Sequence, residues 1–406
     1  MGNIIEKFEK LGIKNAPGQE EKYDVNGKGR FEEELLGDSV DFSHGDVDAF
    51  TPIPGAKDAF ITGYDEGGKQ AYTKYRGREE IREYLAEHLS MFFGTMIDPQ
   101  ENIIITPGTQ GALFLAMGSL VSGGDKVAIV EPDYFANRKI AEFLECKVVP
   151  IRIRYEENED GAGIDFKELE EAFKDDVKLF LFSNPNNPTG VIYSEKEIYE
   201  IIELAARYNV ALIVDELYSR LVYENRKYTH LCAHAGRDLN VVTIIGPSKT
   251  ESLSGFRLGV AVGNREIIER MEKLQAIVSL RAAGYSQAVL KCWFQEPEGF
   301  MEERILQHQK IRDALYEELT EARGVHIRKT EAGSYLFVEL PEMTIGIEQF
   351  CKILRTAANV TVTPGTEFGR EFTHHFRINF SQDYSRSVDA IKRVKTVINR
   401  YRKETI

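Results

Sequence analysis

Short β-branched runs alternate with helical stretches from about residue 102 to residue 263, and this alternation constrains the fold more than any other feature. Between two runs, residues 195–208 place Ile198, Ile201, Ile202 and Ala205 at helical spacing, which gives the helix one apolar stripe to pack against a sheet. This pattern predicts an α/β fold with a mainly parallel sheet. The predicted strands are residues 126–130, 147–153, 177–182, 210–214, 241–245 and 258–262.

The rhythm changes after about Arg281 to long helices interleaved with two strands, which predicts a smaller α+β domain. With 406 residues the chain exceeds the usual size of one hydrophobic core. We expect the polar stretch up to about Phe42 to form an arm plus a helix that belongs to the small domain or to a partner subunit. The expected units are an N-terminal arm with part of the small domain (1–48), a large domain (49–295) and a small C-terminal domain (296–406), whose predicted elements are helices 300–322, 347–358 and 385–403 and strands 334–339 and 376–380.

Charge and hydropathy exclude several classes of partner. The formal net charge is -14, and its acidic residues are spread along the chain, which indicates a solvated surface rather than a nucleic-acid-binding one. Apolar runs such as 127–130 are far shorter than the roughly 20 residues that cross a bilayer. The first residues lack a signal-peptide core, and the four cysteines form no CxxC pair. We therefore expect a cytoplasmic protein with reduced thiols.

Two loops at the ends of predicted strands carry side chains suited to a ligand. The segment Ser183-Asn184-Pro185-Asn186-Asn187-Pro188-Thr189-Gly190 directly follows one strand, and Asp215 ends the next. Ligands bind at the carboxyl ends of parallel strands, where an amide or a carboxylate would be held in place. The alternatives are a simple tight turn for the first segment and a helix N-cap for Asp215.

Two further segments contribute cations and an anion site. The segment Gly246-Pro247-Ser248-Lys249 follows another strand, and a desolvated lysine there can form a Schiff base. Arg257 lies eight residues on and can grip a phosphate with two hydrogen bonds. Upstream, a strand beginning at Ile103 runs through Thr106-Pro107-Gly108 into a helix, whose free amide hydrogens favour an anion.

The order and spacing of these segments resemble the fold-type I pyridoxal-phosphate enzymes, specifically the class I/II aminotransferases of the aspartate aminotransferase kind. The resemblance extends from about Asp41 to the end of the chain. It implies a large domain with a mainly parallel, seven-stranded sheet flanked by helices, plus a smaller α+β domain. It also implies pyridoxal 5'-phosphate as cofactor, amino acid and 2-oxo acid as substrates, and a homodimer with shared active sites.

The resemblance assigns roles to residues at the cofactor. Lys249 would form the internal aldimine and later move a proton between the substrate α-carbon and the cofactor. Asp215 would pair with the pyridine nitrogen, Asn187 and Tyr218 would hydrogen-bond the phenolic oxygen, and Tyr134 would stack on the ring. Gly246 stands where many relatives have a phosphate-binding serine, so Ser248 or a backbone amide would compensate. The remaining phosphate cradle would be Gly108, Thr109, Gln110 and Arg257.

Substrate contacts follow from the same resemblance. Arg377 would hold the substrate α-carboxylate, with a backbone contact from Gly45. Tyr72, with Tyr75 as a competing assignment, would reach the phosphate in the neighbouring subunit. Arg281 would cross the interface to bind a distal carboxylate, which favours aspartate or glutamate, although it can instead pair with a surface acid.

Other chemistries have weaker support. An aminotransferase for aromatic or neutral amino acids, or a fold-type I lyase, decarboxylase or racemase, stays open because one fold hosts many reactions. A non-catalytic regulator would need a DNA-binding module, and a nucleotide-binding protein would need a GxGxxG or GxxxxGK[ST] loop. The eight histidines, with the adjacent His374 and His375, show no HExxH spacing, so we expect no metal and surface or packing roles for them.

Overall fold

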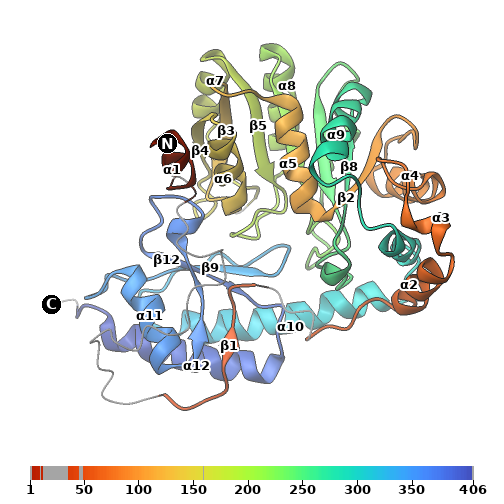
Figure 1. Cartoon of the computed structure of the whole chain (residues 1–406). Coiled ribbons are helices and arrows are strands. Elements are labelled where there is room, and N and C mark those ends of the chain that lie inside the picture. The colour runs from red at the N-terminus through yellow and green to blue at the C-terminus, as the bar shows by residue number, and fades with distance from the viewer. Residues whose placement is uncertain (1, 10, 12–34, 45–48, 159, 405–406) are drawn as a thin grey trace.

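A seven-stranded sheet forms the centre of the larger part of the molecule (Figure 1). The computed structural model describes residues 2–9, 11, 35–44, 49–158 and 160–404. The strand order is β2-β8-β7-β6-β5-β3-β4, and β8 runs antiparallel to both neighbours while the other pairs are parallel. The strands are β2 (Ile103–Pro107), β3 (Lys126–Glu131), β4 (Lys147–Arg152), β5 (Val177–Ser183), β6 (Ala211–Asp215), β7 (Val241–Ile245) and β8 (Leu258–Gly263).

The predicted α/β fold with a mainly parallel sheet is confirmed, and the predicted strands shift by at most one residue. One shift matters for the site, because β6 ends at Asp215 and the carboxylate is therefore part of the strand. The predicted helix 195–208 is α8 (Glu195–Tyr208), and Ile198, Ile201 and Ala205 are buried as its apolar stripe. Ser194 begins the helix with a capping box completed by Glu197.

Helices cover both faces of the large sheet. Along β5, Phe180 and Phe182 face one side and pack with residues of α7 and α8, whereas Leu179 and Leu181 face the other side and pack with residues of α5 and α9. This alternation is the two-residue period of a strand buried on both faces. The flanking helices are α5 (Gly108–Leu120), α6 (Phe135–Phe143), α7 (Phe166–Lys174), α8 and α9 (Arg265–Val278).

A three-stranded antiparallel sheet and three long helices form the smaller part, at the bottom of Figure 1. The sheet has the order β11-β12-β9, and one hydrophobic cluster joins it to the helices. The predicted strands and helices after residue 300 are all present within two residues of their expected ends. They are β9 (Tyr335–Glu339), β11 (Thr363–Pro364), β12 (His375–Asn379), α10 (Phe300–Thr320), α11 (Ile347–Ala357) and α12 (Tyr384–Tyr401).

The N-terminal segments divide between the two parts. Strand β1 (Val40–Asp41) pairs in parallel with β10 (Val360–Thr361), next to the smaller sheet. Helix α1 (Gly2–Glu9) instead contacts α6 of the same chain through Phe8 and Phe143, whose ring centroids are 6.1 Å apart. Ile4, Ile5 and Phe8 of this helix nevertheless stay largely exposed, so the expectation that it belongs to the small domain or to a partner subunit stays a prediction.

Residues 56–93, for which the sequence suggested no elements, form three helices beside the edge strand β2 (Figure 1). They are α2 (Ala56–Asp65), α3 (Gly68–Ala71) and α4 (Glu79–Phe93). Among the residues described, no helix is both long enough and apolar enough to pass through a bilayer. The domain boundaries at residues 48 and 295 stay predictions.

The Glu197 side chain should be a major source of stability. Its carboxylate accepts hydrogen bonds from the backbone N–H groups of Ala162, Gly163, Ile164 and Ser194 at 2.7 to 3.2 Å. Glu197→Ala leaves these buried donors unpaired, so we expect the free energy of unfolding to fall by about 3 kcal/mol or more. Denaturant unfolding measures this loss. The control is Glu195→Ala in the same turn, whose exposed pair with Lys227 should contribute less than about 1 kcal/mol; equal losses would contradict the prediction.

Candidate active site

A cavity of about 1080 Å³ lies where the carboxyl ends of the parallel strands face the smaller sheet. Strands β5, β6 and β7 end at its wall, and β12 supplies the opposite side. The structure therefore brings most of the residues singled out from the sequence into one place. Those that line the cavity are Thr109, Gln110, Tyr134, Asn187, Asp215, Tyr218, Ser248, Lys249, Arg257 and Arg377.

Asp215 is a carboxyl group held in a desolvated position. It ends β6, and its Oδ1 accepts a hydrogen bond from the backbone N–H of Leu217 at 3.1 Å. Burial raises the pKa of Asp215 to about 6, and the neighbouring Glu216 adds to this rise. A buried carboxylate with so few donors is suited to a cationic partner that enters the cavity.

A second buried carboxyl group, Asp133, holds the strand ends together. It accepts hydrogen bonds from the backbone and the hydroxyl of Ser183 and from the backbone N–H of Tyr134. Burial raises its pKa to about 7. Asp133 lies one residue before Tyr134 but was not predicted to have a role. Its position between the end of β3 and the start of α6 was the signal that could have indicated one.

The start of α5 forms a tightly packed cradle. Gly108 has φ 75°, and a Cβ there would lie 2.7 Å from Nη2 of Arg257. A Cβ on Gly259 would lie 2.3 Å from the carbonyl carbon of Gly108, so β8 can approach the helix start only as glycine. Gly246 likewise contacts Thr109, since its Cβ would lie 2.9 Å from Cγ2 of that residue. The start of α5, the Arg257 guanidinium and the Thr109 side chain therefore lie close together, and the N-terminus of a helix favours an anion.

The Asn-rich segment, residues 183–190, is a tight turn and also lines the cavity. Both alternatives considered for it, a simple turn and a loop at a ligand site, therefore describe part of its structure. The Asn186 amide donates to the Pro132 carbonyl at 3.1 Å and accepts from the Thr189 hydroxyl at 2.6 Å. These bonds leave the side chain of Asn187 free to face the cavity. There its Oδ1 accepts a hydrogen bond from Arg377 at 2.9 Å.

Arg377 is held in place from several directions. It is 4% exposed, and besides Asn187 it donates to the Ser43 carbonyl at 2.6 Å. Its guanidinium lies over the ring of Tyr335 at 4.3 Å, and the Tyr335 and Tyr218 hydroxyls are 2.5 Å apart. Tyr335 and Ser43 line the cavity but were missed, because no spacing in the sequence links them to Tyr218 or Arg377.

The loop that carries Lys249 is anchored by two buried arginines. Arg304 of α10 donates to the Thr250 carbonyl at 3.1 Å and to the Ser252 hydroxyl at 2.7 Å. Arg220 pairs with Glu251 at 2.5 Å and with Glu296 at 2.7 Å. Lys249 therefore lines the cavity directly before a segment, Thr250 to Ser252, that these two arginines hold in place.

The predicted contacts Tyr72 and Arg281 lie outside this cavity. Tyr72 is 78% exposed, and Arg281 lies over its ring at 4.7 Å and over that of Tyr75 at 5.1 Å. Arg281 also donates to the Thr73 carbonyl at 2.6 Å rather than to a surface acid. Neither Tyr72 nor Arg281 lines the cavity as the described part of one chain forms it. Gly45 lies outside the described residues.

Known proteins resemble this chain in both fold and sequence. The family model for class I and II aminotransferases matches residues 38–391. A crystal structure of an aspartate aminotransferase from Rhodobacter sphaeroides 2.4.1 is 54% identical, with a TM-score of 0.92 over 98% of this chain and 100% of that one. An aspartate aminotransferase of Sulfolobus acidocaldarius is 30% identical over 82% of this chain and 84% of its own length. A (5-formylfuran-3-yl)methyl phosphate transaminase of Methanocaldococcus jannaschii is 31% identical over 88% and 90%.

These matches, together with the seven-stranded sheet and the lysine-bearing cavity, define the class of protein as a fold-type I aminotransferase. The chain belongs to the class I and II aminotransferase family. The predicted fold, family and general reaction are therefore confirmed.

The Glu251 carboxyl group should make stability depend on pH. Burial raises the pKa of Glu251 to about 7, and because the unfolded carboxyl loses its proton first, stability falls as pH rises between about 4.5 and 7. Glu251→Gln does not titrate, so its free energy of unfolding relative to the natural protein should rise by about 3 kcal/mol from pH 5 to pH 8.

Denaturant unfolding at several pH values measures this difference. Glu296→Gln is the matched control, because Glu296 faces the same Arg220 but has a lowered pKa. Its difference from the natural protein should stay flat above pH 6. A Glu251→Gln difference that falls with rising pH would show that Arg220 outweighs burial.

Proposed function

We propose that this aminotransferase binds pyridoxal 5'-phosphate on Lys249 and transfers the amino group of an L-amino acid, aspartate or glutamate in particular, to a 2-oxo acid by a ping-pong mechanism. The observation that carries this proposal is that Lys249, the partly buried Asp215 and Arg377 line one cavity although they lie on three separate segments. An amine, an anion and a carboxylate-binding guanidinium are the groups that the reaction requires.

The residues present fit the cofactor. The Asp215 carboxylate, buried at the end of β6, can pair with a protonated pyridine nitrogen. The Gly108, Thr109 and Gln110 amides at the start of α5, with Arg257 and Ser248, would hold the phosphate. Tyr134 would lie against the ring, and Asn187 and Tyr218 would hydrogen-bond its phenolic oxygen. When bound, the cofactor supplies an electron sink for charge that develops at the substrate α-carbon.

The chain's own groups would orient the substrate and move the proton. Arg377 presents a rigid fork to the α-carboxylate, already fixed by Asn187 and by the rings beneath it. Holding that carboxylate helps set the direction of the breaking α-C–H bond. The Lys249 amine would then carry the proton from the α-carbon. Arg304 and Arg220 anchor its loop and so help to position the amine.

In a homodimer with shared active sites, the predicted residues outside the cavity would act in the partner subunit. Tyr72 and Arg281 lie together on the surface beside the exposed Tyr75. We infer that this group enters the active site of a second copy, where Tyr72 would meet the phosphate and Arg281 a distal carboxylate. The proposal of an acidic substrate depends on Arg281.

We also expect the protein to work in the cytoplasm with residues 49–295 as its cofactor-binding domain and residues 296–406 as its small domain. The four cysteines are all described and are free thiols, which suits a reducing compartment. The cavity between the two parts makes closure over the substrate a reasonable expectation.

Replacement of the lysine tests the centre of the proposal. In the natural protein, borohydride reduction should attach a pyridoxyl group to the peptide that contains Lys249, as mass spectrometry detects. Lys249→Ala should abolish this attachment and lower kcat by at least about 10²- to 10⁴-fold, because the proton-transfer group is lost. Lys139→Ala is the control, since Lys139 lines the same cavity but pairs with Glu367. Attachment elsewhere in the natural protein would overturn the assignment.

Replacement of Arg281 tests the substrate. Arg281→Ala should raise the KM for aspartate by roughly 10- to 100-fold, the effect of losing a charge-assisted hydrogen bond, and should change the KM for alanine little. Steady-state kinetics with both amino acids measure the two values, and Arg281→Lys should recover part of the affinity for aspartate. Equal changes for aspartate and alanine would exclude the distal-carboxylate role.

A further inference from the structure

A cluster of metal-ligating side chains lies outside the cavity, at the joint between the two parts of the molecule. It consists of Glu156, Glu339 and His375, and one ligand atom of each lies within 4.8 Å of the others. Glu156 belongs to the loop after β4, Glu339 ends β9 and His375 begins β12. None of the three lines the cavity as the described residues form it.

Strand register places a fourth candidate ligand beside this cluster. His375 pairs with Glu339 across the antiparallel strands β12 and β9. On its other side Glu339 pairs with His326 through an isolated antiparallel bridge. Paired residues on neighbouring strands project from the same face with Cβ atoms about 4.5–5.5 Å apart. His326, Glu339 and His375 therefore form a row, and Glu156 approaches this row from the loop.

The individual contacts favour a bound cation. Nε2 of His375 is 3.8 Å from Oε1 of Glu156. Glu156 and His375 thus face one another across the joint, although they come from the loop after β4 and from β12. The His375 ring is 12% exposed and stacks on Phe337 with centroids 5.0 Å apart. An aromatic wall on one side strengthens the electrostatic attraction of the carboxylates for a cation.

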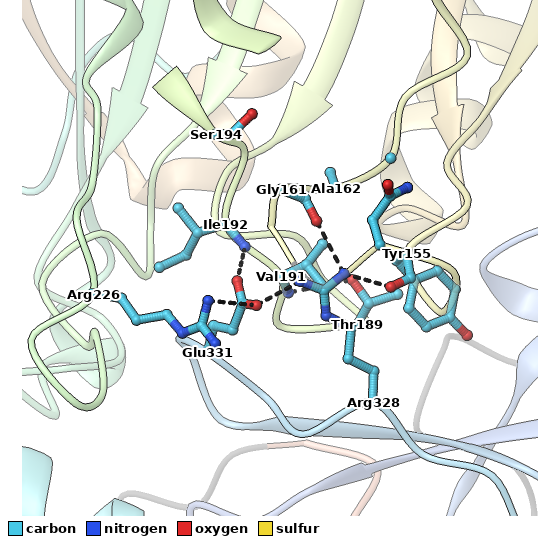
Figure 2. A network of polar contacts seen from close by, with 12 residues as sticks. Tyr155, Gly161, Ala162, Thr189, Val191, Ile192, Ser194, Arg226, Arg328 and Glu331 are labelled. Atoms are coloured by element: carbon cyan, nitrogen blue, oxygen red, sulfur yellow. Dashed lines mark hydrogen bonds and ion pairs between the residues drawn. The ribbon is translucent and has the colours of Figure 1, made fainter. Parts of the chain in front are cut away.

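The loop that carries Glu156 is held against the smaller sheet before any ligand binds. The Tyr155 hydroxyl donates to Glu156 at 2.9 Å. Figure 2 shows Arg328 directed at the carbonyls of Tyr155 and Gly161, and the Gly161 contact is 2.9 Å. Arg328 also pairs with Glu331, whose carboxylate accepts from the backbone N–H of Ile192 at 3.0 Å. Ligands from different segments thus keep their relative positions, which lowers the entropy lost on binding.

We propose that Glu156, Glu339 and His375, with His326 as fourth ligand, form a site for a divalent transition-metal ion such as Zn²⁺. Imidazole and carboxylate ligands together suit zinc and its neighbours better than calcium or magnesium. Two carboxylates with a neutral imidazole balance the charge of a divalent cation. Ligand atoms around tetrahedral zinc lie roughly 3.3–3.6 Å apart. The ligand atoms of Glu156, Glu339 and His375, which lie within 4.8 Å of one another, would move closer together by about an ångström to bind it.

The site would join the loop after β4 to the strand that holds the proposed substrate arginine. Arg377 lies two residues after His375 on β12, so both side chains project from the same face of the strand. A metal ion bound here would fasten this strand to the larger part of the molecule and stabilise the folded state. The ion contributes no step to amino transfer.

Metal titration of the tag-free holoenzyme tests the proposal. Isothermal calorimetry with ZnCl₂ should show one site per chain, and His375→Gln and Glu156→Gln should each weaken binding by at least about 10-fold. Co²⁺ is a second probe, because a tetrahedral site gives it visible absorption that competing Zn²⁺ removes. His374→Gln is the matched control, since this exposed neighbour lies outside the cluster and its variant should bind zinc as the natural protein does.

The outcomes distinguish a specific metal site from nonspecific metal binding. Loss of the Co²⁺ band in His375→Gln and Glu339→Gln, but not in His374→Gln, supports the proposal. Equal binding by the natural protein and all of these variants, or equal loss in His374→Gln, overturns it. Thermal unfolding without metal shows whether each variant is folded, and a zinc-dependent rise in Tm that disappears in Glu156→Gln supports the site even if His375→Gln is unstable.

Discussion

The hydrogen-bond ladder of the seven-stranded sheet decides where every reactive group of this protein emerges. Parallel pairing of β5, β6 and β7 brings the ends of three strands to one edge. Asp215 ends β6 there, and Asn187 and Lys249 lie on the loops that follow β5 and β7. Strand β8 returns antiparallel, so Arg257 precedes it at the same edge and meets Gly108 at the start of α5. The cavity exists because four chain segments end or begin at this edge.

Buried charge at this edge is balanced by interactions with other parts of the chain. Arg220 and Arg304 anchor the Lys249 loop, and Arg304 comes from α10 of the smaller part. Removal of one partner from such a group leaves the other buried without compensation, which destabilises a protein strongly. Stability of the lysine loop and cohesion between the two parts of the molecule therefore depend on the same side chains.

A second joint connects the two parts on the opposite side of the Asn-rich loop. Arg328 and Glu331 hold the loop after β4 and the segment after Gly190 (Figure 2). The row of His326, Glu339 and His375 lies at the end of the same small sheet, and His375 is two residues from Arg377 along β12. A metal ion bound to this row would therefore affect the position of β12, the strand that carries the proposed substrate arginine.

Patterns in the amino-acid sequence were enough to predict the alternation of strands and helices, the smaller α+β part, and the strand-end positions of Asp215, Asn187 and Lys249. Local patterns suffice for these features because hydrophobic periodicity and turn residues act over a few neighbouring positions. The sequence did not predict which distant groups meet in the folded chain: Tyr335 with Tyr218, Arg220 with Glu251, Glu156 with His375, and α1 with α6. These contacts depend on how strands are ordered and paired across the sheets, and that order is set by packing of the whole chain rather than by spacing along it.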